Sequence, residues 1–115
     1  MLTQNTLIAM ALELPGAEPG TAWSEAVAKV GGKALFYWNP QWQAAVFNLD
    51  FDTRDMLIEA DPETFFTTDH HRNWPCVLAR PETVDEGWVR LQLLRAWRRH
   101  APKRLQKQHP DLLKD

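Results

Sequence analysis

The stretch EAVAKVGGKALFYWNPQWQAAVFNLDF, residues 25–51, contains three short apolar runs that are separated by chain breakers. Gly31 and Gly32 lie between the first two runs, and glycine adopts positive φ at little cost, so we expect two short strands hinged at this pair. Asn39 and Pro40 form the next turn, and QAAVFNLDF then completes a hairpin. The stretch therefore predicts three strands in antiparallel order.

Apolar spacing predicts a helix on either side of these strands. The residues with helical spacing before them are Leu7, Met10, Ala11 and Leu14. Pro15 ends this helix, and AEPGTAW, residues 17–23, is expected to be a loop. After the strands, Asp52 or Thr53 can cap a helix over residues 54–61, because a side-chain oxygen there would accept from free amides of the first turn.

Two more strands and a long helix complete the chain. We expect the strands within residues 63–70 and 74–81, and the longest helix over residues 83–101, opened by Asp85 or Thr83. The element order α-β-β-β-α-β-β-α predicts the α+β class, with an antiparallel sheet and helices packed on one side.

Length and composition favour a single domain over residues 1–115. A chain of 115 residues that is 44% hydrophobic is long enough for one core and too short for two. Within it, residues 103–115 are expected to form a short basic helix and a flexible tail. The lone Cys76, the lack of a cleavable leader and the lack of an apolar run of ~20 residues predict a cytoplasmic protein without membrane contact.

Charge is distributed unevenly along the chain. Residues 1–79 hold four Lys and Arg against ten Asp and Glu, a net charge of −6, whereas residues 80–115 hold nine against five, a net charge of +4. Residues 90–107, RLQLLRAWRRHAPKRLQK, carry seven basic residues and no acid. At 100° per residue, the last helix has an apolar arc, expected in the core, and an opposite arc, expected in solvent. The core arc contains Val89, Leu93, Ala96, Trp97 and His100, and the solvent arc contains Gln92, Arg95, Arg98 and Arg99.

Two surface features are candidates for contact with a partner. A basic helix face can bind phosphate groups, although a run of arginines also serves solubility and complements the helix dipole. The nucleic-acid-binding candidates are Arg95, Arg98, Arg99, Lys103, Arg104, Lys33 and Arg72. Trp38 and Trp42 flank the NPQ turn, where at least one ring should be exposed for contact with a partner or with a base. Alternatively, these rings cover the apolar face of their own hairpin.

The segment TTDHHRNWPC, residues 67–76, places two histidines close to the only cysteine. Adjacent histidines on an extended chain point to opposite faces, so His70 and His71 should not share an ion, and we expect no metal and no cofactor. Cys76 lies in an apolar run and is expected to be a core residue rather than a nucleophile, so no catalytic residue is assigned. His70 either bonds a backbone carbonyl or lines a pocket.

Four segments carry a family signal through their order and spacing. They are LELPGAE at 12–18, VGGKALF at 30–36, FFTTDHHRNWPCVLAR at 65–80 and AWRRHAPKRL at 96–105. Together they resemble the MmcQ/YjbR family, small bacterial domains with a CyaY-like α+β fold. The family commonly shows a TPHYxGxPxVLVRL-like stretch. This sequence keeps His70 and Pro75 and has Asp69, His71, Asn73 and Pro81 in place of the proline, tyrosine, glycine and leucine.

The resemblance implies a double wing of two β-hairpins, proposed to straddle DNA, and it brings no catalytic residues. Here Lys33 is the only basic residue of the first wing, residues 33–47, and the second wing offers Arg72 and Arg80. We therefore expect a weak, mainly electrostatic DNA-binding or DNA-associated module, monomeric or weakly dimeric. The alternative is a non-enzymatic domain that binds a small molecule or a protein in a pocket near His70 and Lys33.

Overall fold

Residues 2–114 are described by a computed structural model, in which the first helix, α1 (Gln4–Ala11), begins at a capping box. The Thr3 hydroxyl accepts from the Thr6 amide at 3.1 Å, and the Thr6 hydroxyl accepts from the Thr3 amide at 2.7 Å, so two otherwise free N–H groups are bonded. The helix buries its predicted apolar face through Leu7, Met10 and Ala11.

The first sheet contains a strand that the sequence did not predict. Its order is β1 (Glu18–Ala22), β2 (Glu25–Val30) and β3 (Lys33–Ala34), with both pairings antiparallel. The expected loop over residues 17–23 is therefore wrong. Pro19 and Gly20 suggested a loop, but β1 is an edge strand, where a residue without an N–H group is tolerated.

The second sheet has the order β4-β5-β7-β6, and all its pairings are antiparallel. Its strands are β4 (Tyr37–Asn39), β5 (Ala44–Asn48), β6 (Phe65–Phe66) and β7 (Cys76–Ala79). The predicted single sheet is thus divided, because the strand expected after Gly32 breaks between β3 and β4. Leu35 and Phe36 lie at this break and both are buried. Successive residues of a straight strand point to opposite faces, so the chain bends to bury both side chains.

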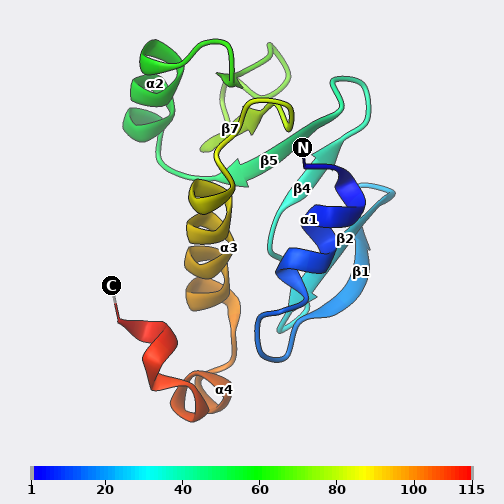
Figure 1. The fold of residues 1–115 in the computed structure, drawn as a ribbon, viewed down its shortest axis with the longest axis vertical. Helices are drawn as coiled ribbons and strands as arrows, with labels where there is room; N and C mark the ends of the chain where they lie inside the picture. Colours follow the sequence, from blue (N-terminus) through cyan, green and yellow to red (C-terminus); the bar gives the residue numbers. More distant parts are fainter. Residues whose placement is uncertain (1, 115) are drawn as a thin grey trace.

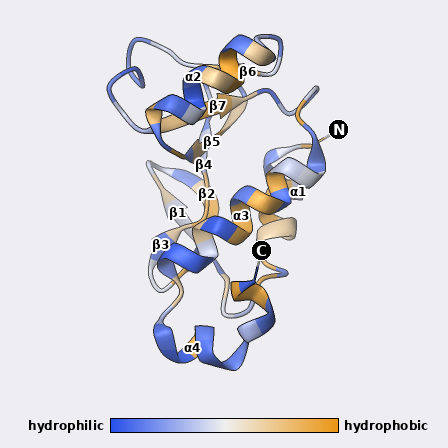
Figure 2. Ribbon diagram, turned by 90° about the vertical axis from the view of Figure 1, so that its left-hand side faces the viewer, coloured by the Kyte–Doolittle hydropathy of each residue, from blue (hydrophilic) through white to orange (hydrophobic). Residues whose placement is uncertain are grey.

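Helices α1 and α3 (Glu86–His100) pack against one face of the sheets, as Figures 1 and 2 show. Trp88 of α3 contacts Phe47 and Phe65 edge to face, with ring centroids 5.4 and 4.8 Å apart. Trp97 is fully buried, and its indole N–H donates to the Pro15 carbonyl at 2.8 Å. The α+β class with antiparallel strands and helices on one side is confirmed, and the CyaY-like topology stays a prediction.

The remaining helices differ from expectation at their ends. Asp85, one of the two predicted residues, caps α3, whereas α2 (Phe51–Ala60) is capped by Asp50 rather than by Asp52 or Thr53. The pattern missed this cap because α2 begins with Phe51, an exposed apolar residue. After α3, the chain forms the hydrophilic helix α4 (Lys103–Gln108) and a 3-10 turn over Pro110–Leu113 (Figure 2). The flexibility expected of this tail stays a prediction.

No helix within residues 2–114 combines the length and the apolar character that a bilayer crossing requires.

Candidate functional site

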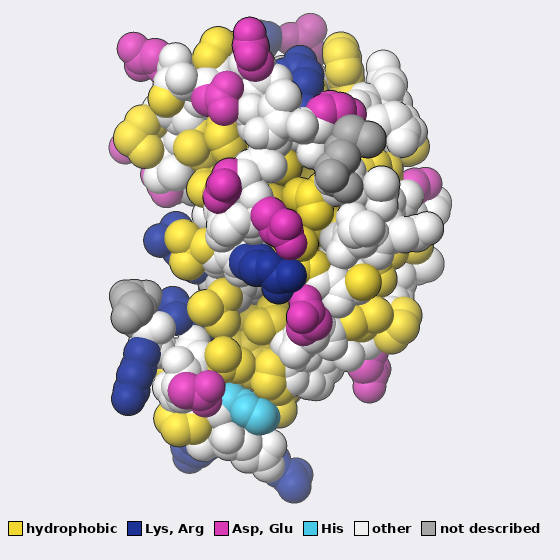
Figure 3. Space-filling model, viewed as in Figure 1, with side chains coloured by type: hydrophobic (Ala, Val, Ile, Leu, Met, Phe, Trp, Pro, Cys, Tyr) yellow, Lys and Arg dark blue, Asp and Glu magenta, His cyan; other side chains and the backbone are white. Residues whose placement is uncertain are grey.

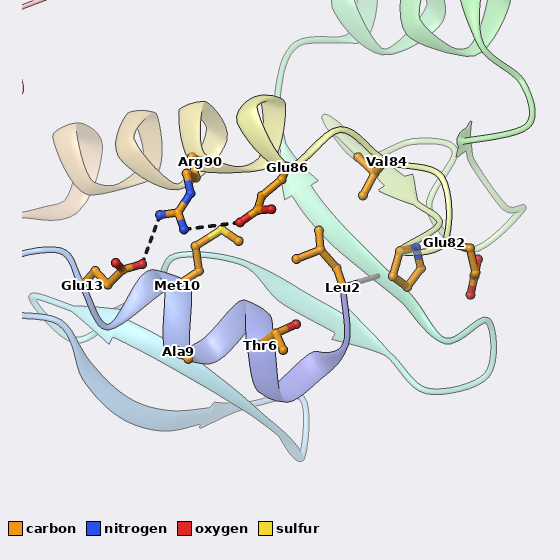
Figure 4. Close-up of a pocket in the computed structure, with 10 residues that line it drawn as sticks. Leu2, Thr6, Ala9, Met10, Glu13, Glu82, Val84, Glu86 and Arg90 are labelled. Atoms are coloured by element: carbon orange, nitrogen blue, oxygen red, sulfur yellow. Dashed lines mark hydrogen bonds and ion pairs between the residues drawn. The ribbon is translucent and has the colours of Figure 1, made fainter.

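A cavity of about 530 Å³ lies between α1 and the start of α3 (Figure 4). Three glutamates border it, and two of them hold Arg90. The Arg90 guanidinium bonds the Glu13 carboxylate at 3.1 Å and the Glu86 carboxylate at 3.4 Å, and the Glu13 bond raises the pKa of Arg90. Because its one cation is already paired, and Glu82 adds a third acid, this cleft does not suit an anionic ligand.

A second cavity, of about 350 Å³, opens where the β2–β3 turn packs against the end of α3; we call it the cationic groove. It is lined by Ala22, Trp23, Lys29, Gly32, Lys33, Ala34, Tyr37, Asn48 and His100. Trp23 and Tyr37 form its aromatic wall, because their rings stack at 4.1 Å with an interplanar angle of 15°. No carboxylate lines the groove.

Two exposed arginines of α3 extend the positive charge of this groove. Partial burial, and then the charge of Arg95, lower the pKa of Arg99. Partial burial also lowers the pKa of His100, and the charges of Arg99 and Lys33 lower it further. These shifts favour the neutral form of His100. Within residues 2–114, Lys29, Lys33, Arg95 and Arg99 form no ion pair, so their charges stay available to a ligand.

A third cavity, of about 240 Å³, which we call the indole pocket, shares Trp23 with the cationic groove. It is lined by Trp23, Trp38, Asn39, Pro40, His70, His71 and Trp74. The rings around it are tilted rather than parallel. The Trp74 ring lies 5.5 Å from that of Trp23 at 50°, and 5.6 Å from that of His70 at 51°. These rings form the walls of a concave site.

The structure separates the predicted basic residues into groups. Arg95 and Arg99 lie on the exposed side of α3, Lys33 lies in the groove, and Lys103 and Arg104 are exposed on α4. Figure 3 shows several basic side chains around the end of the molecule where α4 lies, whereas most acidic ones on that face lie higher. Arg72 is on the β6–β7 connection and is paired with Asp69. The structure thus places both Lys33 and Arg99 close enough to act on His100, and it leaves Arg72 apart.

Two residues of the predicted solvent arc are less exposed than expected. Arg98 is half-buried, and its guanidinium donates to the Leu112 carbonyl at 2.6 Å and to the Lys114 carbonyl. Arg98 is therefore bonded to the C-terminal segment of the chain. Its assignment to the nucleic-acid-binding surface is corrected. Gln92 is buried because it lies one turn from both Val89 and Ala96. The buried face of α3 therefore includes every position of the i, i+3, i+4, i+7 pattern that starts at Val89.

The two tryptophans that flank the NPQ turn differ in exposure. Trp42 is 49% exposed and meets the Phe66 ring edge to face at 5.6 Å, so the expectation of one exposed ring is confirmed. Trp38 is only 5% exposed and belongs to the core. Its predicted role in contact at the hairpin tip is corrected, because successive residues of β4 alternate between the two faces of the sheet.

The histidine segment is a turn and not an extended chain. The rings of His70 and His71 therefore lie edge to face with centroids 5.1 Å apart, and the expectation that they point to opposite faces is wrong. Within residues 2–114, no three His, Cys, Asp or Glu side chains gather where a metal ion would need them. The absence of a metal stays a prediction. Cys76 is buried, as predicted, and burial raises the pKa of its thiol.

Some residues of these sites had no clear signal in the sequence. Trp23 and Lys29 were missed because β1 was expected to be a loop, so the β1–β2 hairpin that carries Trp23 was not recognised. Arg54 was missed because nothing local indicates that an arginine is buried. Its guanidinium donates to the Arg72 carbonyl at 2.7 Å and thereby fixes the turn that carries His70 and Trp74.

These features define a small α+β domain in which two antiparallel sheets carry a cationic and an aromatic cavity that share one tryptophan. The YjbR family model matches residues 12–99, and the chain belongs to this family. Neither the curated proteins nor the solved structures gave a match. The resemblance that the sequence suggested is thus confirmed at the level of the family.

Proposed function

We propose that this protein binds nucleic acid weakly and mainly through electrostatic attraction, with the cationic groove and the adjoining arginines of α3 as its contact surface. One observation carries the proposal. Lys29 and Lys33 line a groove without a carboxylate, Arg99 adjoins it, and none of the three is neutralised by an ion pair within residues 2–114.

The physical argument rests on counterion release. Each phosphate that a lysine or arginine contacts releases condensed cations from the nucleic acid, so affinity falls steeply as salt is added. With about three to five phosphates contacted, log K should decline with a slope of roughly −3 to −4 against log salt. The net charge of −2 for the whole chain opposes association and keeps binding weak. We assign no catalytic step to this surface.

A salt titration with two charge-matched double variants tests the proposal. Arg95→Gln with Arg99→Gln removes two unpaired charges beside the groove and should flatten the salt slope by about 2. Arg72→Gln with Arg90→Gln removes the same formal charge, but both of these arginines are already paired with carboxylates. The control should therefore keep the wild-type slope within about 0.5.

Two results would oppose the proposal. One is the absence of binding to either duplex or single-stranded DNA at about 20 mM salt, where electrostatic attraction is strongest. The other is an equal loss of slope in both double variants, which would mean that net charge alone matters. The pocket-binding alternative would then lead. In that alternative the ligand would bind in the indole pocket and would not contact Lys33, because Lys33 lines the cationic groove instead.

A further inference from the structure

The geometry points to the indole pocket as a site for one unpaired nucleobase, so that the protein prefers single-stranded nucleic acid to duplex. This inference rests on the proposed function, and it names the substrate class and the contact that the groove alone does not provide.

The walls and size of the pocket suit a single planar ring system. Trp23 and Trp74 are 53% and 42% exposed, so each leaves part of its side chain open to a ligand. The volume of about 240 Å³ is below the roughly 300–1,000 Å³ of most ligand pockets, which favours one base over a larger molecule. No carboxylate lines the pocket, which argues against a cationic ligand.

Two residues that line the pocket each have a ring nitrogen without a hydrogen bond among the described residues. His71 is 3% exposed and Trp38 5% exposed, and both border the pocket. His71 bonds Thr68 through Nδ1 at 2.7 Å, but within residues 2–114 neither its Nε2 nor Nε1 of Trp38 has a hydrogen bond. The only fully enclosed side-chain polar atom without a partner in this range is Thr67 Oγ1, so neither of these two nitrogens is fully enclosed. The edge of a base would supply hydrogen-bonding groups for both.

The backbone at Trp23 has an unfavourable conformation. Trp23 and Ser24 have φ of 53° and 66°, and Ala22 pairs with Glu25, which is the geometry of a type I′ hairpin turn. Glycine and asparagine favour these positions, whereas a tryptophan there is strained. The strained turn carries the ring onto Tyr37 and beside Trp74.

The position of the pocket beside the groove makes the two contacts compatible. Trp23 lines both cavities, so a base in the pocket and a phosphate on Lys29 or Lys33 are separated by one side chain. A base in a duplex is paired and stacked, and it must leave the stack before it can enter such a pocket. A single strand has no such barrier and gains stacking on aromatic rings.

The test uses labelled oligonucleotides and fluorescence anisotropy at low salt, with the full chain throughout. Wild-type protein should bind a single-stranded oligothymidylate about 10-fold more tightly than an abasic strand of the same length or a duplex. Trp74→Ala should lose that advantage and leave binding to the abasic strand unchanged. Trp42→Ala is the matched control, because it removes a similarly exposed indole outside the pocket and should change nothing. Trp38→Phe keeps the packing but removes the indole N–H, and it should weaken single-strand binding only.

Each outcome separates the base pocket from the groove. Equal affinity for the abasic strand, the duplex and the single strand would overturn the base pocket and leave electrostatic binding in place. The same conclusion would follow if Trp74→Ala bound the single strand like wild type. No binding to any of the three would overturn the proposed function and the base pocket together.

Discussion

Gly31 packs directly against the backbone of His100: a Cβ atom on Gly31 would lie 2.6 Å from the His100 carbonyl oxygen. Real Cβ atoms essentially never approach so closely, so only glycine allows the β2–β3 turn to reach the end of α3. This contact joins two segments that are far apart in the sequence and brings Lys33 to Arg99 and His100. The cationic groove therefore depends on a residue that carries no charge.

We predict that Gly31→Ala is more destabilising than Gly32→Ala. Both glycines have positive φ, 59° and 79°, so each substitution should cost about 1 to 2 kcal/mol from backbone strain. Nothing lies within 4 Å of a Cβ on Gly32, whereas Gly31→Ala must also move the end of α3, at a further cost of about 1 kcal/mol or more. Urea denaturation of both variants checks this. Equal losses would show that the close approach to His100 does not constrain the fold.

Periodic features of the chain could be predicted from the sequence because their cause is local. Trp97 was placed in the core from helical spacing with Val89 and Leu93, and it is fully buried. Asp85 or Thr83 was expected to open the last helix, and the Asp85 carboxylate accepts from the Trp88 amide at 2.9 Å.

Features that depend on contacts across the chain could not be predicted in this way. Arg98 has the same local surroundings as Arg99, and only the return of the C-terminal segment distinguishes the two. Trp23 and Trp74 line one pocket although they are distant in sequence. Trp23 lies in the β1–β2 turn, and Trp74 lies in the β6–β7 connection. Strand β1 was also missed, because it contains Pro19 and Gly20, which are typical of loops. Edge strands tolerate such residues, whereas central strands exclude them.

Trp97→Ala should destabilise the protein by ~3 to 5 kcal/mol, because it leaves a large cavity in the core. It also leaves the Pro15 carbonyl without its indole donor. Trp97→Phe separates the two effects, since it restores much of the volume but not the hydrogen bond. Thermal or urea unfolding gives the values, with Trp42→Ala as the surface control, expected to lose less than about 1 kcal/mol. A comparably small loss for Trp97→Ala would contradict its place in the core.

Stability should fall as the pH is lowered from about 7.5 to about 5.5. Burial, and then the neighbouring His70, lower the pKa of His71 in the folded state below its ordinary value of 6.5, and burial also lowers the pKa of His100. Below pH 6.5 the unfolded chain therefore binds more protons than the folded protein. The stability that neutral His71 contributes is present above this pH and is lost as the pH falls through the folded pKa.

Urea midpoints at the two pH values measure this effect in wild type and in His71→Gln. The variant loses the titrating group, so its free energy of unfolding should change less between the two pH values. Carboxylates such as Asp50, whose pKa is lowered by its bonds to Thr53, titrate well below this window and should not obscure the comparison. A wild-type stability that rises toward the lower pH would have the wrong sign for buried neutral histidines.

Asp50→Ala should destabilise α2 by about 1 kcal/mol. One Asp50 carboxylate oxygen accepts from the Thr53 amide at 3.0 Å, and the other accepts from the Thr53 hydroxyl at 2.6 Å. Asp52, in the first turn, has no such bond among residues 2–114 and interacts only with the helix dipole. Asp52→Ala is therefore the matched control and should cost less than about 0.5 kcal/mol. Urea denaturation measures both losses of stability. A larger loss in Asp52→Ala than in Asp50→Ala would indicate that Asp52 is the cap.

Arg54→Met should destabilise the protein by about 1 to 3 kcal/mol and disturb the indole pocket. Arg54 is 9% exposed, and its loss leaves the Arg72 carbonyl, in the turn before Trp74, without a buried donor. Arg72→Met is the control, because it removes only an exposed ion pair with Asp69 and should cost less than about 1 kcal/mol. Amide hydrogen exchange of residues 70–74 is the second readout. It should speed up in Arg54→Met and not in Arg72→Met, and unchanged exchange in both would mean that the turn is held by its own backbone bonds.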